Sequence, residues 1–466
     1  MEEESLLYEE ELQLFLKLPP SYLSESEDLI SKLPDALISQ ILLYLPTKEA
    51  LWTSVLSNRW KSLWLLIPGL DLDSSQFPNY DAFVSFVDRF LDFSREQNSC
   101  LHKLKLSIRK DVNDPPCVTR WIDFVARRKL KHLDVECLVN RNFLEVIPLS
   151  LYICDTLVYL RLHRVSLGKL ESVSLPSLKT MSLEHNVYAN DVVLESLISS
   201  CPVLEDLNMV RMVEDNVKVL RVRSQTLTSL NIDFLFGEGD DMVDDFEKKD
   251  QGVLIDAPRL KSLKFQDDLS DSKTITNSGS LAKVDIVYVF NENDCADVVD
   301  LPKRNMVRNF FTSISGVSYM KISDHTLEFF YYNLDFDPLP QFCNLSRLKV
   351  TFSLLNLEML PTILKSCPNL KSLVLVLDFD HLDERVKIRF SSVPCCLLSS
   401  LELVEIKKFN GGPAKMEVAK YFVENSVILE KLLVRVSCSR YDEGFFVLTD
   451  LLALPRRSSS CRIVVC

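Results

Sequence analysis

A short pattern of apolar residues recurs along most of the chain and restricts the possible folds more than any other feature. Each copy has an apolar residue, two further residues, a second apolar residue, one residue and a third apolar residue, as in LKSLVL. The copies begin at Leu101, Leu130, Leu157, Leu178, Leu204, Leu227, Leu260, Leu281, Val317, Leu345, Leu370, Leu398 and Leu429. They lie 21 to 36 residues apart, so the chain consists largely of stacked structural repeats.

The last four residues of each copy alternate between apolar and polar side chains, as in a short strand with one buried face. Amphipathic segments such as DVVLESLISSCPVL and LEMLPTILKSCPNL lie between copies and predict helices. The spacing is that of leucine-rich repeats, about 20–29 residues, with longer intervals marking insertions. The sequence therefore predicts an α/β fold: a curved solenoid of strand-turn-helix repeats, with strands on the concave wall and helices on the convex wall.

The 13 cysteines are odd in number and scattered, without the repeated C-x-x-C spacing of a zinc site. Two of them, Cys201 and Cys367, precede a proline directly before a predicted strand. We expect these two thiols to be buried where a helix turns into a strand, because proline ends the helix there. We expect no metal site, and reduced thiols of the kind found in the cytosol or nucleus.

A different segment, residues 33–64, precedes the repeats and reads LPDALISQILLYLPTKEALWTSVLSNRWKSLW. Pro34 and Pro46 bracket an apolar run of about three helical turns. Thr47 is a suitable N-cap for a second helix, and Ser57 for a third helix that ends before Pro68. The apolar stripe of the first helix is wide enough to pack against neighbouring helices and still present apolar surface outside. A self-contained three-helix core is the alternative interpretation.

This segment resembles the F-box, the helical module that docks substrate receptors onto the Skp adaptor of cullin-based ubiquitin ligases. About 40 residues is near the lower limit for a module that folds unaided, so dependence on a partner is expected. The residues expected to form the adaptor-binding face and the core behind it are Leu33, Pro34, Leu37, Ile38, Ile41, Leu42, Leu45, Pro46, Val55, Leu56, Trp60 and Trp64. The sequence does not divide them into core and interface.

The whole chain resembles the plant family of F-box proteins with leucine-rich repeats and a C-terminal FBD segment. The segment VPCCLLSSLELVEIKKFNGGPAKMEVAKYFVENSVILEKLLVRV and the ending LLALPRRSSSCRIVV resemble the FBD segment, although Cys395 and Cys396 depart from it. The expected organisation is an acidic N-terminal extension over residues 1–26, an F-box over 27–72, repeats over 73–385 and an FBD cap over 386–466. The fold expected from this resemblance is thus a three-helix F-box followed by a capped solenoid.

The charge of the chain disfavours several classes of function. With 53 basic and 66 acidic side chains its net charge is −13, which argues against nucleic acid or an anionic membrane as partner. The acidic start lacks the features of a secretion signal, and no long apolar stretch suggests a membrane span, so we expect the nucleus or cytoplasm. The six histidines lie in no catalytic motif. We therefore expect no catalytic residue and no cofactor.

The family resemblance implies a non-catalytic adaptor: the F-box binds the Skp adaptor and through it cullin, while the repeats present a protein substrate for ubiquitination. Two alternatives are a receptor for a small, hormone-like molecule and a scaffold outside any ligase. The receptor would need cations converging on a phosphate-rich ligand. The concave basic residues Arg161, Lys264, Lys321 and Lys349 are expected to be scattered and matched by Asp134, Asp285 and Glu402.

An acidic insertion, residues 237–252, is expected to be a mobile loop because its seven acids and two lysines cannot repay the entropy of ordering. We predict fast amide hydrogen exchange throughout this segment of the isolated protein. Strong protection there would contradict the prediction.

Overall fold

The computed structural model of the chain divides it into two compact units, Met1–Pro68 and Gly69–Cys466. The structure describes residues 30, 32–96, 101–111, 116–138, 144–170, 172–234, 251–267, 270, 272–288, 301–332, 339–379, 388–390, 392–437 and 441–466. The N-terminal extension and nearly all of the acidic insertion lie outside these residues.

The described residues of the first unit form two α-helices followed by two 3-10 segments. They are α2 (Asp35–Leu42), α3 (Thr47–Trp52), η1 (Thr53–Val55) and η2 (Trp60–Leu66). Helix α2 ends before Leu45, because the amides of Tyr44 and Leu45 bond three residues back and tighten the last turn ahead of Pro46. The predicted third helix is a 3-10 helix that starts after Arg59, and neither Thr47 nor Ser57 acts as an N-cap. The expected third helix is thus present as a 3-10 helix and not as an α-helix.

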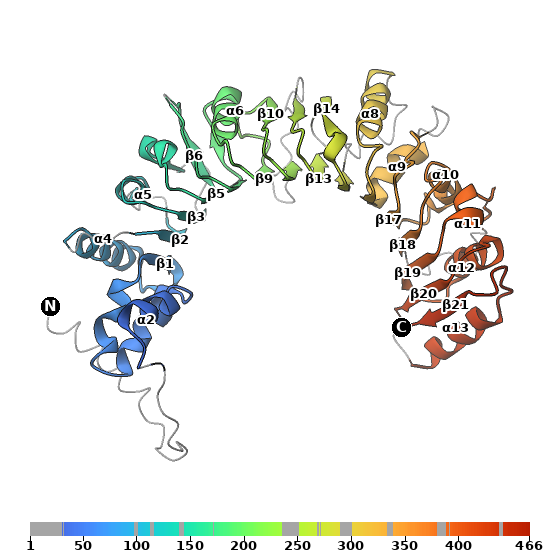
Figure 1. The fold of residues 1–466 in the computed structure, drawn as a ribbon, viewed down its shortest axis with the longest axis horizontal. Coiled ribbons are helices and arrows are strands. Elements are labelled where there is room, and N and C mark those ends of the chain that lie inside the picture. The colour runs from blue at the N-terminus through green and yellow to red at the C-terminus, as the bar shows by residue number, and fades with distance from the viewer. Residues whose placement is uncertain are drawn as a thin grey trace, which may run out of the picture. The chain divides into compact units, whose positions relative to one another are not determined.

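The second unit is built on one large parallel sheet, in which neighbouring strands follow one another along the chain (Figure 1). Its 15 strands are, in spatial order, β1 (Gly69–Asp73), β2 (Lys103–Arg109), β3 (His132–Leu138), β5 (Tyr159–His163), β7 (Thr180–Glu184), β9 (Asp206–Arg211), β11 (Ser229–Phe234), β13 (Ser262–Asp267), β15 (Lys283–Tyr288), β16 (Tyr319–Ile322), β17 (Arg347–Phe352), β18 (Ser372–Leu377), β19 (Leu403–Phe409), β20 (Lys431–Val436) and β21 (Arg462–Val465).

Twelve of these strands begin two residues after the start of a copy of the apolar pattern, as predicted, and the thirteenth copy, at Leu398, is misplaced. Strand β1 was not predicted, although IPGLDL at Ile67 fits the same pattern. The last strand, β21, pairs with β20 along the edge of the sheet.

The copy assigned to Leu398 was placed three residues too early. Leu398 lies in the helix α11 (Cys395–Ser399) and is exposed, whereas Leu401 is fully buried. The pairing of β18 with β19 sets Leu373 opposite Val404, so the correct copy is LELVEI, starting at Leu401. Both frames place apolar residues at the spacing of the pattern, and only the pairing with β18 distinguishes them.

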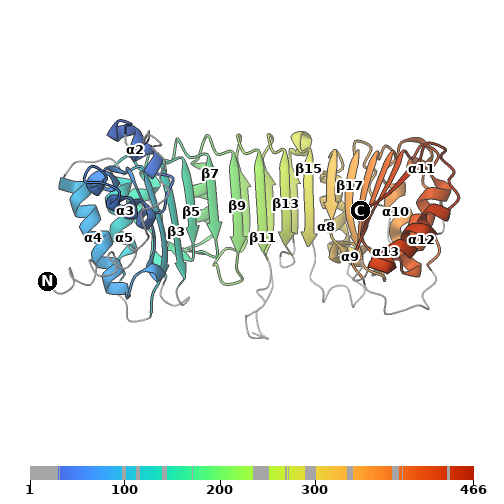
Figure 2. The same ribbon diagram turned by 90° about the horizontal axis from the view of Figure 1, so that it is seen from below.

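The other side of the sheet is covered by helices toward the two ends of the unit and by short strands in the middle (Figures 1 and 2). The helices among the described residues are α4 (Tyr80–Glu96), α5 (Val118–Ala126), α6 (Asp191–Ser199), α8 (Leu301–Ser313), α9 (Asp324–Tyr332), α10 (Leu360–Lys365), α11, α12 (Pro413–Asn425) and α13 (Tyr441–Ala453). The short strands form two parallel sheets: β4 (Glu145–Val146), β6 (Val165–Leu167) and β8 (Val187–Tyr188), and β10 (Val219–Arg223), β12 (Gly252–Asp256) and β14 (Ser272–Thr276). Single 3-10 turns complete the connections: η3 (Ser74–Gln76), η5 (Leu149–Ile153), η6 (Ser278–Ser280) and η7 (Leu357–Met359).

Repeat length explains why strand-turn-helix was the wrong expectation for the middle repeats. The copies at Leu157, Leu204 and Leu260 are followed by the next copy after only 21 to 23 residues. An average α-helix takes about 11–12 residues, which leaves too little chain for the strand and both turns. The described residues of these three connections form β6, β10, and β14 with η6 instead.

The core of the unit consists of apolar columns that run across the strands. One column begins with Leu70 on β1, continues with Leu104 on β2, and ends with Ile463 on β21. Each of its members lies directly opposite the next one on the neighbouring strand. Cys201 and Cys367 are buried at the ends of α6 and α10, as predicted, and burial raises the pKa of each thiol to about 12. Both thiols therefore stay protonated and serve as packing groups.

The C-terminal segment covers the last repeat, and we predict that the unit aggregates or becomes protease-sensitive without it. Removing residues 451–466 takes away β21, bares the edge of β20, and uncovers apolar residues that β21 and the end of α13 bury. Size-exclusion chromatography and limited proteolysis measure the effect. A truncated chain that stays monomeric and has the same melting temperature as the full chain would contradict this prediction.

Two neighbouring leucines of α13 allow a sharper test. Leu451 is fully buried, whereas Leu452 is 49% exposed. We expect Leu451→Ala to lower the free energy of unfolding of this end by about 2–5 kcal/mol, and Leu452→Ala to change it by less than about 0.5 kcal/mol. Equal effects on thermal unfolding would contradict the closing role of α13.

Candidate protein-binding surfaces

The first unit divides its apolar side chains between a small core and an exposed set. Ile38, Leu42 and Trp60 are buried in one cluster together with Ala50, Leu63 and Ile67. Leu33, Leu45 and Trp64 are half-buried against this cluster. The remaining residues predicted for this face are exposed: Pro34, Leu37, Ile41, Pro46, Val55 and Leu56.

Helix α2 produces this division because adjacent positions on a helix point about 100° apart. Ile38 and Leu42 point into the core, while Leu37 and Ile41 remain 46% and 47% exposed. Tyr44, three residues beyond Ile41, is 90% exposed. The wide apolar stripe thus packs the unit on one side and leaves a second apolar row outside.

Two exposed aromatic residues were missing from the predicted face. Tyr44 falls seven residues after Leu37, a spacing that places both on one side of a helix, so helical spacing was the available signal. Trp52 is 61% exposed, and the ammonium of Lys48 lies 5.6 Å from its ring centroid. Large exposed aromatic side chains are typical anchors of protein interfaces.

Arg59 ties the start of α2 to the segment before η2. Its guanidinium Nε and Nη2 donate to Asp35 Oδ1 at 2.9 and 2.6 Å, and Nη2 also donates to the backbone oxygen of Leu33. Charge-assisted hydrogen bonds of this kind are among the stronger ones in proteins. They hold Leu33 and Pro34 in one orientation beside the exposed row of α2.

The inner face of the large sheet is the second candidate surface. Over β3, β5 and β7 its charges neutralise one another: Arg161 lies 3.1 Å from Asp134 and 2.7 Å from Glu184. The hydrogen bond to Glu184 raises the pKa of Arg161 above its usual value. Burial works against ionisation of Glu184, but the bonds from Arg161 and Ser182 outweigh it and keep the pKa of this carboxyl below its usual value.

A ladder of uncharged polar side chains continues from this ion pair across the next strands. Ser182 donates to Glu184 at 2.7 Å, Asn208 donates to Ser182 at 2.7 Å, and Asn231 donates to Asn208 at 2.5 Å. Ser182, Asn208 and Asn231 stand in one row on β7, β9 and β11. They form a continuous polar surface whose groups largely bond to each other.

The histidines on this face act as packed aromatic groups. His132 stacks on Tyr159 with ring centroids 4.1 Å apart, and His163 meets His185 edge to face at 5.4 Å. Burial lowers the pKa of both His132 and His163, so both rings are neutral near pH 7. Among the described residues, no group of histidine, cysteine and acidic side chains could hold a metal ion.

Three of the four concave cations that were expected to be scattered lie close together. Lys264, Lys321 and Lys349 occupy one row across β13, β16 and β17, with Asp285 of β15 between the first two. Asp285 lies 2.9 Å from Lys321, whereas Glu402 lies 4.0 Å from Lys371 and matches none of the three. Only Arg161 stands apart, because three strands separate β5 from β13.

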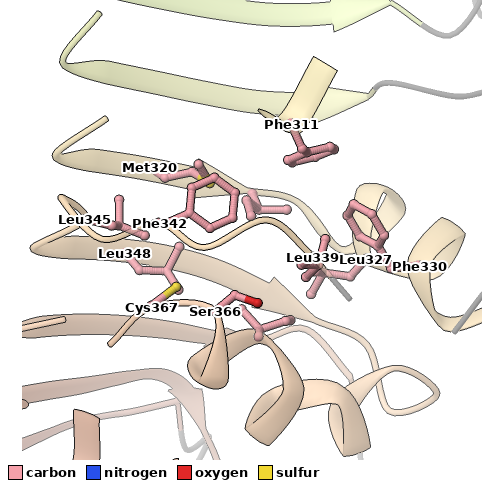
Figure 3. Close-up of a pocket in the computed structure, with 12 residues that line it drawn as sticks. Phe311, Met320, Leu327, Phe330, Leu339, Phe342, Leu345, Leu348, Ser366 and Cys367 are labelled. Atoms are coloured by element: carbon pink, nitrogen blue, oxygen red, sulfur yellow. The ribbon is translucent and has the colours of Figure 1, made fainter. Parts of the chain in front are cut away.

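An apolar pocket lies between the sheet and the helices behind it, at β16 and β17 (Figure 3). Phe311 of α8, Phe330 of α9, Met320 and Leu348 of the strands and Cys367 are among its lining residues. Its volume of about 10 Å³ is close to that needed for one water molecule. This pocket is too small for the hormone-like ligand of the alternative hypothesis, since ligand pockets measure about 300–1,000 Å³.

Comparison with known proteins identifies the parts of the chain. The F-box domain profile matches residues 30–68, and the FBD profile matches residues 389–434. The profile described as "FBD-associated F-box protein At5g56370, LRR repeats" matches residues 118–288. The described part of the chain contains no helix long and apolar enough to cross a membrane.

Several Arabidopsis thaliana proteins resemble the chain over nearly their whole length. The FBD-associated F-box protein At5g22730 is 75% identical over 446 residues, 96% of both chains. The FBD-associated F-box protein At5g44490 is 58% identical over 445 residues, 94% of this chain and 91% of the relative. The F-box/FBD/LRR-repeat protein At5g22700 is 46% identical over 445 residues, 95% of this chain and 99% of the relative. The chain belongs to the plant family of F-box proteins with leucine-rich repeats and a C-terminal FBD segment.

Proposed function

We propose that the chain is a non-catalytic substrate adaptor of an SCF-type ubiquitin ligase. F-box proteins of this family generally serve as such adaptors, and F-box domains generally bind Skp-type proteins. In this proposal the first unit binds the Skp adaptor and through it cullin. The second unit, a curved leucine-rich-repeat solenoid closed by the FBD segment, binds a protein substrate. The proposed site of action is the nucleus or cytoplasm, in keeping with the free buried cysteines.

The exposed apolar row of the first unit is the observation that carries this proposal. Leu37, Ile41, Tyr44 and Trp52 remain in contact with water although the unit has few apolar side chains to spare for its own core. Exposed apolar side chains in such a concentration mark surfaces that a partner covers. The buried core of Ile38, Leu42 and Trp60 would hold the helix that carries the exposed row in position. The hydrogen bonds of Arg59 would do the same for the adjacent Leu33 and Pro34.

We predict that Leu37→Ser combined with Ile41→Ser abolishes capture of the Skp adaptor and cullin. Each truncated anchor costs about 2 kcal/mol or more of binding free energy, so two losses weaken binding about a thousandfold. Both side chains are about half exposed, so the unit keeps its core. Affinity purification of the tagged full-length chain from plant cells, with expression matched, measures the recovered adaptor and cullin.

The matched control is Ala36→Ser combined with Gln40→Ser, two exposed positions of the same helix outside the apolar row. This variant should recover both partners at the level of the original chain. Leu33 is unsuited to the test because it packs on the core, so its loss would disturb folding and docking together. Undiminished recovery with the Leu37 and Ile41 variant would refute docking through this row.

A further inference from the structure

We propose that the concave face over β13, β15, β16 and β17 binds an acidic segment of the substrate protein. The inference rests on the proposed function, because it assigns a chemical class to the substrate that the second unit would present. It concerns five residues, named here the basic patch: Lys264, Lys283, Lys321, Arg347 and Lys349.

Strand register gathers the basic patch into two adjacent rows. Lys264, Asp285, Lys321 and Lys349 form one row, and Lys283, Tyr319 and Arg347 form the row beside it. Both rows are on the face opposite the buried columns, since their neighbours along each strand are core residues. Side chains on adjacent strands stand about 4.8 Å apart, so the patch is continuous.

Most charges of the basic patch have no ion-pair partner among the described residues. Lys321 pairs with Asp285, and the Lys283 ammonium lies 5.5 Å from the Tyr319 ring centroid. No ion pair joins Lys264, Arg347 or Lys349 to a described acidic residue, although Asp233 on the neighbouring strand β11 lies near Lys264. Lys264, Lys283 and Arg347 are exposed, and Lys321 and Lys349 are half-buried.

This arrangement is unfavourable for the isolated chain. Lys321 and Lys349 stand directly opposite each other on adjacent strands, and like charges in that position destabilise a sheet. On the strands from β1 to β7 of the same face several cations are compensated, as Lys103 is by Asp71 and Arg161 by Asp134 and Glu184. A bound anion would relieve the repulsion in the basic patch, which gathers its cations on a chain whose net charge is −13.

The shape of the basic patch favours a peptide over a compact phosphate ligand. From β13 to β17 the row crosses three strand spacings, about 14 Å, which an extended peptide covers with about four residues. Tight phosphate binding needs donors that converge on one point, and the basic patch instead spreads its cations along a line. The residues directly opposite the two ends of the row are uncharged: Asn231 on β11 lies opposite Lys264, and Val374 on β18 lies opposite Lys349.

The test measures binding of a fluorescent peptide of alternating glutamate and serine, about eight residues long so that it exceeds the row, to the full-length chain by fluorescence anisotropy. A peptide with glutamine in place of glutamate is the control ligand. The variant Lys264→Gln with Arg347→Gln removes two exposed cations of the basic patch. The matched control, Lys431→Gln with Arg462→Gln, removes one lysine and one arginine from the same face at β20 and β21.

The original chain should prefer the glutamate peptide, and the preference should fall as salt is raised, because exposed charge contacts are screened. The basic-patch variant should raise the Kd for this peptide about tenfold, and the matched control should leave it within about twofold. All variants should still capture the Skp adaptor, so failure of this proposal is separable from failure of the proposed function.

Three outcomes would overturn the proposal. One is equal affinity for both peptides, or equal effects of the two variants. A second is binding of inositol hexakisphosphate or of an oligothymidine without binding of the glutamate peptide, which would assign the patch to a small phosphate ligand or to nucleic acid. The third is glutamate-peptide binding that appears only after residues 238–250 are deleted, which would make the acidic segment of the chain itself the occupant.

Discussion

The second unit depends on the burial of apolar columns that no single repeat can cover alone. Leu70, Leu104 and Leu133 stand in register on consecutive strands, and every further strand of the large sheet extends the same column. Each strand contacts only its neighbours, so the stability of the unit is close to a sum of nearest-neighbour terms. Strand β20 has no full repeat after it, and α13 with β21 supplies the cover at the C-terminal end.

The apolar columns fix the inner face, while repeat length decides what lies behind the sheet. Longer repeats form a helix there, such as α8 or α12. The shortest repeats form only a strand, such as β6 or β10. Both solutions bury the same columns. The inner face therefore keeps regular strand spacing through the change from helices to strands and back, so rows of side chains such as Ser182, Asn208 and Asn231 can run across several repeats.

Periodicity in the sequence predicted the strands well, because an apolar residue at every second position is typical of a strand with one buried face. It failed where two frames fit equally, as at Leu398 and Leu401, because only pairing with the neighbouring strand separates them. Periodicity also could not show that Ile38 is buried and Leu37 exposed, since the orientation of α2 depends on its contacts with η2 and α3. The grouping of Lys264, Lys321 and Lys349 likewise depends on register between segments far apart in sequence.

The two candidate surfaces share one physical property: each keeps groups that the isolated chain leaves unfavourably placed. The first unit leaves Leu37, Ile41 and Tyr44 in water, and the basic patch holds Lys321 beside Lys349. Apolar contacts supply affinity in proportion to the area they bury, whereas exposed charges chiefly govern association rate and choice of partner. An adaptor that binds one constant partner and selects a second partner would need both kinds of surface. Its apolar row would hold the ligase, and its charged row would discriminate among substrates.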